Sequence, residues 1–82
     1  MTAHDELGGR GCLGRAAANE PVFVLRGQDE LAGLTVRTWA GMVMAHAKQF
    51  NGARRRKMEA KAKEALRTAD LMDRWIPRQL PD

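Results

Sequence analysis

Residues 36–76 read VRTWAGMVMAHAKQFNGARRRKMEAKAKEALRTADLMDRWI, and the spacing of apolar residues in this stretch decides the fold. In both halves apolar residues recur at steps of three and four, which is typical of helices with one buried face. The first stripe comprises Val36, Trp39, Ala40, Val43, Ala47 and Phe50. The second stripe comprises Met58, Ala62, Ala65, Ala69, Met72 and Ile76. The stretch therefore predicts two amphipathic helices.

A turn at Asn51-Gly52 separates the two predicted helices, because both residues tolerate the left-handed conformation that ends helices. Asp29 is a plausible N-cap, and either a helix or a short turn followed by a helix is expected to run from there to about Phe50. The second helix is expected over about residues 53–76 and should end before Pro77.

Folding back about this turn brings the two apolar stripes together, with alanine facing alanine. A glycine inside a helix costs up to about 1 kcal/mol relative to alanine, so Gly41 suggests close packing at that point. Glu59 with Lys63, and Asp70 with Arg74, have the spacing of ion pairs along one helix. We therefore predict an antiparallel two-helix hairpin with these pairs on its surface.

A short β-strand is predicted before the hairpin, over residues 21–26, where Pro21 precedes the run VFVL. A lone strand leaves its backbone groups unpaired, so it could pair with a second copy and form a homodimer through residues 21–26. Residues 1–20 are rich in glycine and lack an apolar period, which predicts a flexible N-terminal arm. The predicted fold is mainly α, with β-α-α order in a single domain over residues 21–82.

The length and composition narrow the class of protein. A chain of 82 residues can bury only a small core. No stretch approaches the roughly 20 apolar residues that span a bilayer, so we expect no membrane partner. Cys12 is the only cysteine, which fits a reducing compartment. The expected location is the cytoplasm, within a host cell.

The sequence offers little catalytic chemistry. There is no serine, and His4, His46 and Cys12 do not have the spacing of a zinc site. The string GRGCLG at residues 9–14 matches the dinucleotide fingerprint, but no strand precedes it, so we attribute the match to chance. We expect no enzymatic activity, no cofactor and no metal.

The net charge of +4 is concentrated in residues 53–82, which hold nine cations and five anions. Four consecutive cations stand where the second helix should start, and the helix dipole disfavours each of them there by about 0.3–1 kcal/mol. Since folding does not favour this cluster, an anionic partner is the functional interpretation. The alternative is a merely solvated face. The candidate partner-binding residues are Arg54, Arg55, Arg56, Lys57, Lys61 and Trp75.

The string EPVFVLRGQD at residues 20–29, the pairs Val36-Arg37 and Trp39-Ala40, and ALRTADLMDRW at residues 65–75 resemble a group of small proteins encoded in phages and prophages of proteobacteria. The resemblance excludes the glycine-rich arm and assigns no functional residues. It implies a small single-domain protein that binds host machinery, and anti-CRISPR proteins are a prominent class of this kind.

The leading hypothesis is therefore a non-enzymatic phage-type inhibitor that binds a host protein or ribonucleoprotein defence complex, in the manner of an anti-CRISPR protein. Two alternatives remain open. The chain could bind nucleic-acid phosphates directly, without reading sequence. It could instead be a phage structural or assembly protein that acts as a strand-paired dimer.

Overall fold

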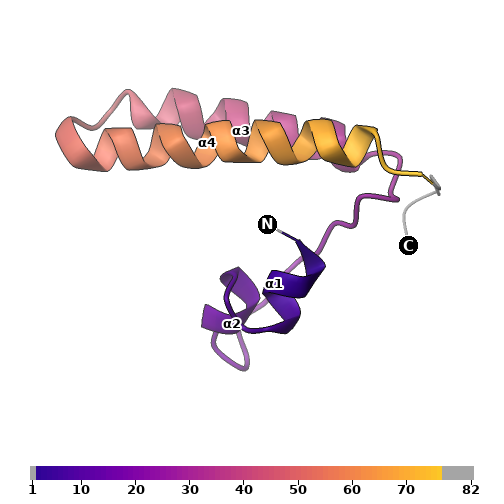
Figure 1. The fold of residues 1–82 in the computed structure, drawn as a ribbon. Coiled ribbons are helices and arrows are strands. Elements are labelled where there is room, and N and C mark those ends of the chain that lie inside the picture. The colour runs from indigo at the N-terminus through magenta and orange to yellow at the C-terminus, as the bar shows by residue number, and fades with distance from the viewer. Residues whose placement is uncertain (1, 77–82) are drawn as a thin grey trace.

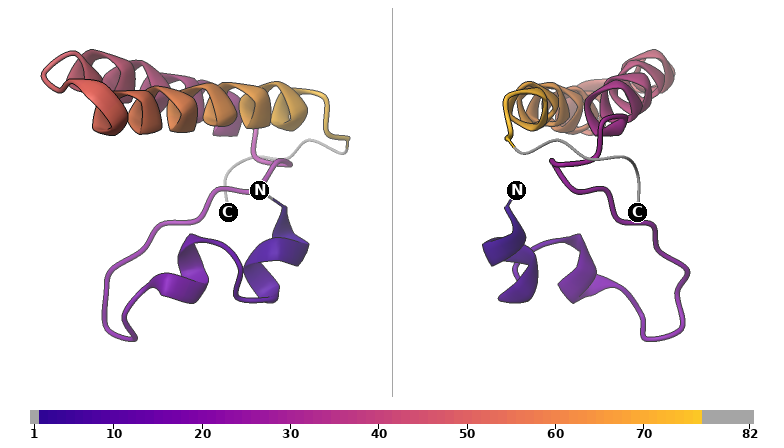
Figure 2. Two further views of the ribbon diagram at one scale, coloured as in Figure 1. Left: turned by 60° about the vertical axis from the view of Figure 1, so that its left-hand side comes forward. Right: turned by 90° about the vertical axis from the view of Figure 1, so that its right-hand side faces the viewer.

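The computed structural model describes residues 2–76, which form four helices. These are α1 (Ala3–Leu7), α2 (Cys12–Arg15), α3 (Ala32–Ala47) and α4 (Gly52–Asp73). In Figure 1, α3 and α4 lie side by side as an antiparallel hairpin, while α1 and α2 lie together below it. Figure 2 shows the same separation, and the helices pack as two pairs, α1 on α2 and α3 on α4. The fold is thus mainly helical, and the predicted hairpin is its main element.

Small residues form the contact between α3 and α4. The five buried apolar residues are all alanines, namely Ala32, Ala40, Ala47, Ala62 and Ala69. Gly33 is also buried, so Gly33, Ala40 and Ala47 repeat every seven residues along α3, as Ala62 and Ala69 do along α4. A seven-residue repeat keeps one seam of a helix against its partner. This burial confirms the predicted packing of alanine on alanine.

The larger residues of the two stripes lie at the edges of this seam. Val36, Val43, Met58 and Met72 are half-buried, whereas Trp39 keeps 47% of its surface exposed. No large side chain among the described residues is fully buried. The hairpin therefore has a narrow core, and its stability depends on how closely the two backbones approach each other.

Helix α3 follows a short turn, which is one of the two arrangements predicted after Asp29. Its N-cap is Leu31, and Asp29 instead closes the preceding turn by accepting a hydrogen bond from the Leu31 amide at 2.8 Å. The Asp29 carbonyl accepts another from Ala32 at 3.1 Å. The expectation that Asp29 caps α3 directly was wrong, because its carboxylate reaches only two residues along the chain.

The hairpin turn contains the predicted left-handed glycine, but it begins earlier in the chain than predicted. Helix α3 ends at Ala47, and a tighter turn continues to Phe50, whose amide donates to the Ala47 carbonyl at 3.0 Å. Gly52 adopts the left-handed conformation (φ +63°), as predicted, whereas Asn51 is extended. Helix α4 ends at Asp73, and Pro77 lies outside the described residues.

The predicted β-strand is not formed. Residues 21–26 run without strand pairing from the α2 region to the start of α3 (Figure 1), and Val22, Phe23 and Val24 are all exposed. Strand propensity measures how well a side chain packs on a pleated surface, and the described residues provide no such surface beside this segment. A dimer through residues 21–26 stays a prediction.

The glycine-rich arm contains two short helices where the composition predicted no regular structure. Thr2 and Asp5 form a capping box at the start of α1. These contacts lower the pKa of the Asp5 carboxyl, chiefly through the hydrogen bond from the Thr2 amide. Glu6 accepts a hydrogen bond from the Leu13 amide at 3.1 Å, which joins α2 to α1. Local capping thus organises this segment without an apolar core. That the arm is flexible stays a prediction.

We predict that enlarging a seam alanine separates the helices. Ala40→Leu adds volume at a buried position of the seam, so it should lower the free energy of unfolding by about 1–3 kcal/mol. Urea denaturation measures the effect. The control is Ala60→Leu on the exposed side of α4, which should change stability by no more than about 0.5 kcal/mol. Equal losses in the two variants would contradict an alanine seam.

The glycines of α3 provide a second test. Close packing at Gly41 was expected wrongly, because Gly41 is exposed and a Cβ added there meets no atom within 4 Å. Gly41→Ala should therefore raise the free energy of unfolding by about 0.5–1 kcal/mol. At Gly33 an added Cβ would collide with the Asp73 carboxylate, so Gly33→Ala should gain less. Equal gains in thermal or urea denaturation would show that Asp73 does not occupy that space.

Candidate functional site

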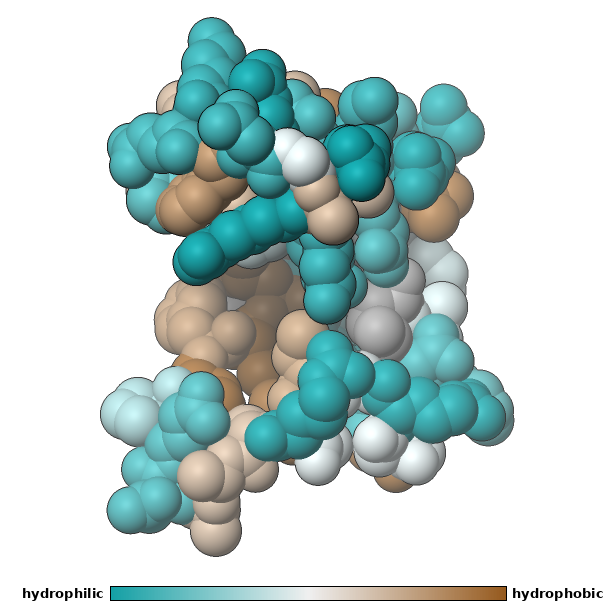
Figure 3. All heavy atoms as spheres, turned by 90° about the vertical axis from the view of Figure 1, so that its left-hand side faces the viewer, coloured by the Kyte–Doolittle hydropathy of each residue, from teal (hydrophilic) through white to brown (hydrophobic). Residues whose placement is uncertain are grey.

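The basic tip, formed by Arg54, Arg55, Arg56, Lys57 and Lys61, occupies the first turns of α4 beside the hairpin turn. The first turn of α4 contains no acidic residue, and the Asn51 side chain donates or accepts no capping hydrogen bond there. Figure 3 views this end of the molecule, where hydrophilic side chains cover the hairpin. The positive end of the helix dipole and the cations therefore both raise the positive electrostatic potential at the start of α4.

Aromatic contacts hold one cation of the tip in place. The Arg54 guanidinium carbon lies 4.2 Å from the centroid of the Phe50 ring. The His46 ring packs edge-on against the Phe50 ring, with 5.3 Å between the two ring centroids. A guanidinium that lies over an aromatic face keeps its N–H groups available at its edge. Arg54 is thus positioned without losing its capacity to bind an anion.

The other tip cations differ in their ion pairs. Arg55 Nε lies 3.4 Å from a Glu59 carboxylate oxygen, and Lys61 Nζ lies 3.6 Å from one of Glu64. Arg56 and Lys57 are exposed and make no ion pair with the described residues. Of the predicted cluster, Arg56 and Lys57 are therefore the most available for an external anion.

An ion-pair bridge between the two helices was missed in the sequence. Arg37 of α3 contacts Asp70 at 2.8 Å and Asp73 at 2.6 Å, both on α4. These hydrogen bonds, the one to Asp73 first, raise the pKa of the Arg37 guanidinium. The buried Gly33 leaves room for the Asp73 carboxylate beside Arg37. The bridge therefore depends on the closeness of the helices.

This bridge corrects the predicted pairs along α4. Asp70 contacts Arg37 in place of Arg74, and Glu59 contacts Arg55 in place of Lys63. The first of these pairs joins the two helices, whereas the second lies within α4 at a spacing of four residues. Lys63 and Arg74 consequently make no ion pair with the described residues.

Trp75 lies away from the basic tip. It follows the C-terminal end of α4, with 58% of its surface exposed, and an added Cβ on Gly27 would lie 3.6 Å from its Cβ and Cγ. The length of α4 separates it from Arg56 by about 28 Å, at 1.5 Å per residue. The structure therefore does not bring Trp75 together with the predicted cations. It places Trp75 beside Gly27 instead, in the segment that precedes α3.

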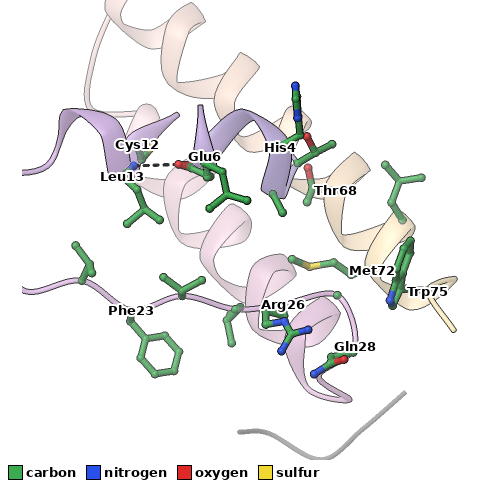
Figure 4. A pocket seen from close by; sticks show the side chains of 18 of the residues that line it. His4, Glu6, Cys12, Leu13, Phe23, Arg26, Gln28, Thr68, Met72 and Trp75 are labelled. Atoms are coloured by element: carbon green, nitrogen blue, oxygen red, sulfur yellow. Dashed lines mark hydrogen bonds between the residues drawn. The ribbon is translucent and has the colours of Figure 1, made fainter. Parts of the chain in front are cut away.

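Trp75 borders an apolar groove between the hairpin and the N-terminal helices. The groove is also lined by Leu13, Val22, Leu71 and Met72, and it forms the hollow with hydrophobic walls in Figure 3. Figure 4 shows Met72 on α4 and Trp75 just beyond the end of α4 facing this space, while the Phe23 ring points away from it. Within residues 2–76 no group of His, Cys, Asp or Glu could hold a metal ion. The groove therefore presents mainly apolar contacts.

We predict that the basic tip weakens the helix that carries it. Arg56→Glu replaces an exposed cation that has no described ion pair with an anion in the second turn of α4, where the helix dipole is weaker than in the first turn, so the free energy of unfolding should rise by only about 0.3 kcal/mol at low ionic strength. Thermal denaturation at low and high salt measures the effect, which salt should reduce. A loss of stability at low salt would show that Arg56 has a structural role.

The comparisons with known proteins identify no family. No protein-family model matches the chain, and no curated protein or solved structure shows significant similarity to it. In the part of the chain that the structure describes, no helix is long and apolar enough to cross a membrane. The resemblance to phage proteins stays a prediction, and a function has to be argued from the geometry of the basic tip.

Proposed function

We propose that this chain is a non-enzymatic binding protein that docks on an anionic surface of a host protein or ribonucleoprotein complex through its basic tip. The observation that carries the proposal is the pair Arg56 and Lys57, exposed and without described ion pairs at the start of α4. Both lie in the second turn of α4, beyond the first turn where the helix dipole acts most strongly, and Lys57 stands four residues from Lys61, so a bound anion would mainly relieve repulsion between neighbouring cations.

The shape of the tip supports binding to a large partner. The tip is the end of a protruding hairpin (Figure 1), which can enter a recess in another molecule. Arg54 is already held against Phe50, so less side-chain entropy is lost when it contacts an anion. The groups with shifted pKa values, Asp5 and Arg37, lie outside the tip and are engaged in structural hydrogen bonds. These features favour recognition over catalysis.

The resemblance to phage-encoded proteins suggests which partner to test first. A small phage protein that binds host machinery would gain most from blocking a defence assembly. A CRISPR surveillance complex presents both RNA and protein surfaces, and its bound RNA supplies the anionic charge that the tip requires. We therefore propose anti-CRISPR-like inhibition as the specific form of this binding.

Charge reversal at the tip tests the proposal. The double variant Arg56→Glu/Lys57→Glu changes two cations without described ion pairs, so folding should be retained while binding to a purified surveillance complex weakens roughly 100-fold or more. A pull-down followed by titration measures the affinity. The control Arg10→Glu/Arg15→Glu makes the same charge change in the segment that holds α1 and α2, at the cost of the ion pair between Arg10 and Asp5, and should bind as the wild type does. Undiminished binding by the tip variant would contradict the proposal.

A further inference from the structure

A second row of cations runs along α4 beyond the tip. Arg56, Lys63, Arg67 and Arg74, here called the outer stripe, are spaced by seven, four and seven residues. At 100° per residue these positions fall within about 40° of one another, on a face turned away from the buried alanines. All four side chains are exposed. The row extends about 27 Å along the helix at 1.5 Å per residue.

The carboxylates of α4 do not neutralise this row. Glu59 contacts Arg55, and Glu64 contacts Lys61. Asp70 and Asp73 both contact Arg37 across the hairpin. No member of the outer stripe makes an ion pair with a described residue. The stripe is therefore a line of cations without described ion pairs, although Glu59 and Asp70 lie within one turn of its members and lower the local positive potential; its unpaired state could not be read from the spacing of charges along α4.

The chemistry of the stripe favours phosphates over an acidic protein helix. A partner helix packs through an apolar seam, but the position enclosed by Arg56, Lys63 and Arg67 on this face is Ala60, which offers only a methyl group. Three of the four cations are arginines, whose planar guanidinium binds phosphate oxygens in pairs. The stripe holds no aromatic side chain on which a base could stack. A continuous phosphate backbone matches a line of charge without such contacts.

We propose that the outer stripe lies along the phosphate backbone of a nucleic acid and binds it without reading its sequence. This inference rests on the proposed function and specifies it, since the anionic partner surface would then be nucleic acid. Arg56 belongs to both the basic tip and the stripe, so the two form one continuous surface. Residues 63, 67 and 74 extend contact to parts of α4 that the tip does not reach.

The test is the salt dependence of binding to labelled nucleic acids. Fluorescence anisotropy with duplex DNA, duplex RNA and single-stranded RNA of one arbitrary sequence gives the affinity at several salt concentrations. Four phosphate contacts predict a slope of log K against log salt of about −3.6 on duplex DNA, and contacts from the tip would make it steeper. Scrambling the sequence should leave the affinity unchanged.

Two matched variants locate the contacts. Lys63→Gln/Arg67→Gln removes two stripe cations outside the basic tip and should make the slope shallower by about 1.8 on duplex DNA. Arg10→Gln/Arg15→Gln removes two cations from the segment that holds α1 and α2 and should leave the slope as in the wild type. Circular dichroism confirms that both variants keep the helical hairpin. An unchanged slope in the stripe variant would overturn the proposal.

The result also separates this inference from the proposed function. If the wild type binds the surveillance complex but none of the three nucleic acids at low salt, the outer stripe does not bind phosphate and the proposed function stands. If the stripe variant then loses the complex, an acidic protein surface is the partner and the nucleic-acid assignment is wrong. If the wild type binds nucleic acid but not the complex, the stripe proposal holds and the defence partner is wrong.

Discussion

The close approach of α3 and α4 is the constraint on which the rest of the structure depends. Only alanine and glycine are buried along the seam, so the backbones can lie near each other and polar side chains at its border can reach across. Gly33 shows this directly, because the space of its missing Cβ is taken by the Asp73 carboxylate. A larger side chain at Gly33 or Ala40 would move the helices apart and with them the partners of Arg37.

The same constraint shapes the surface. By drawing Asp70 and Asp73 to Arg37, the packed hairpin leaves Arg74 without a described ion pair, although both carboxylates stay partly exposed on α4. Surface ion pairs contribute little to stability, so this arrangement matters chiefly for which cations are paired. Interhelical packing thus decides which cations are neutralised and which remain available to a partner.

The hairpin and its alanine seam could be predicted because a three-and-four spacing describes burial within one helix. Contacts that depend on the second helix could not: Asp70 lies four residues from Arg74 but contacts Arg37, thirty-three residues away. The residues VFVL at 22–25 favour a strand only when another strand lies beside them. For α1 a signal existed, since Thr2 and Asp5 have the spacing of a capping box, but the glycines that follow concealed it. The outer stripe was concealed in the same way by the ion pairs assumed for Lys63 and Arg74.

The position of the basic tip also couples binding to stability. A narrow alanine core gives a small domain a small stability margin, and cations at the start of α4 reduce that margin through the helix dipole. An anion bound at the tip would interact favourably with both the dipole and the cations, so it would stabilise the hairpin by an amount that grows with the logarithm of its concentration relative to its dissociation constant. A bound anion would thus supply the negative charge that the first turn of α4 lacks.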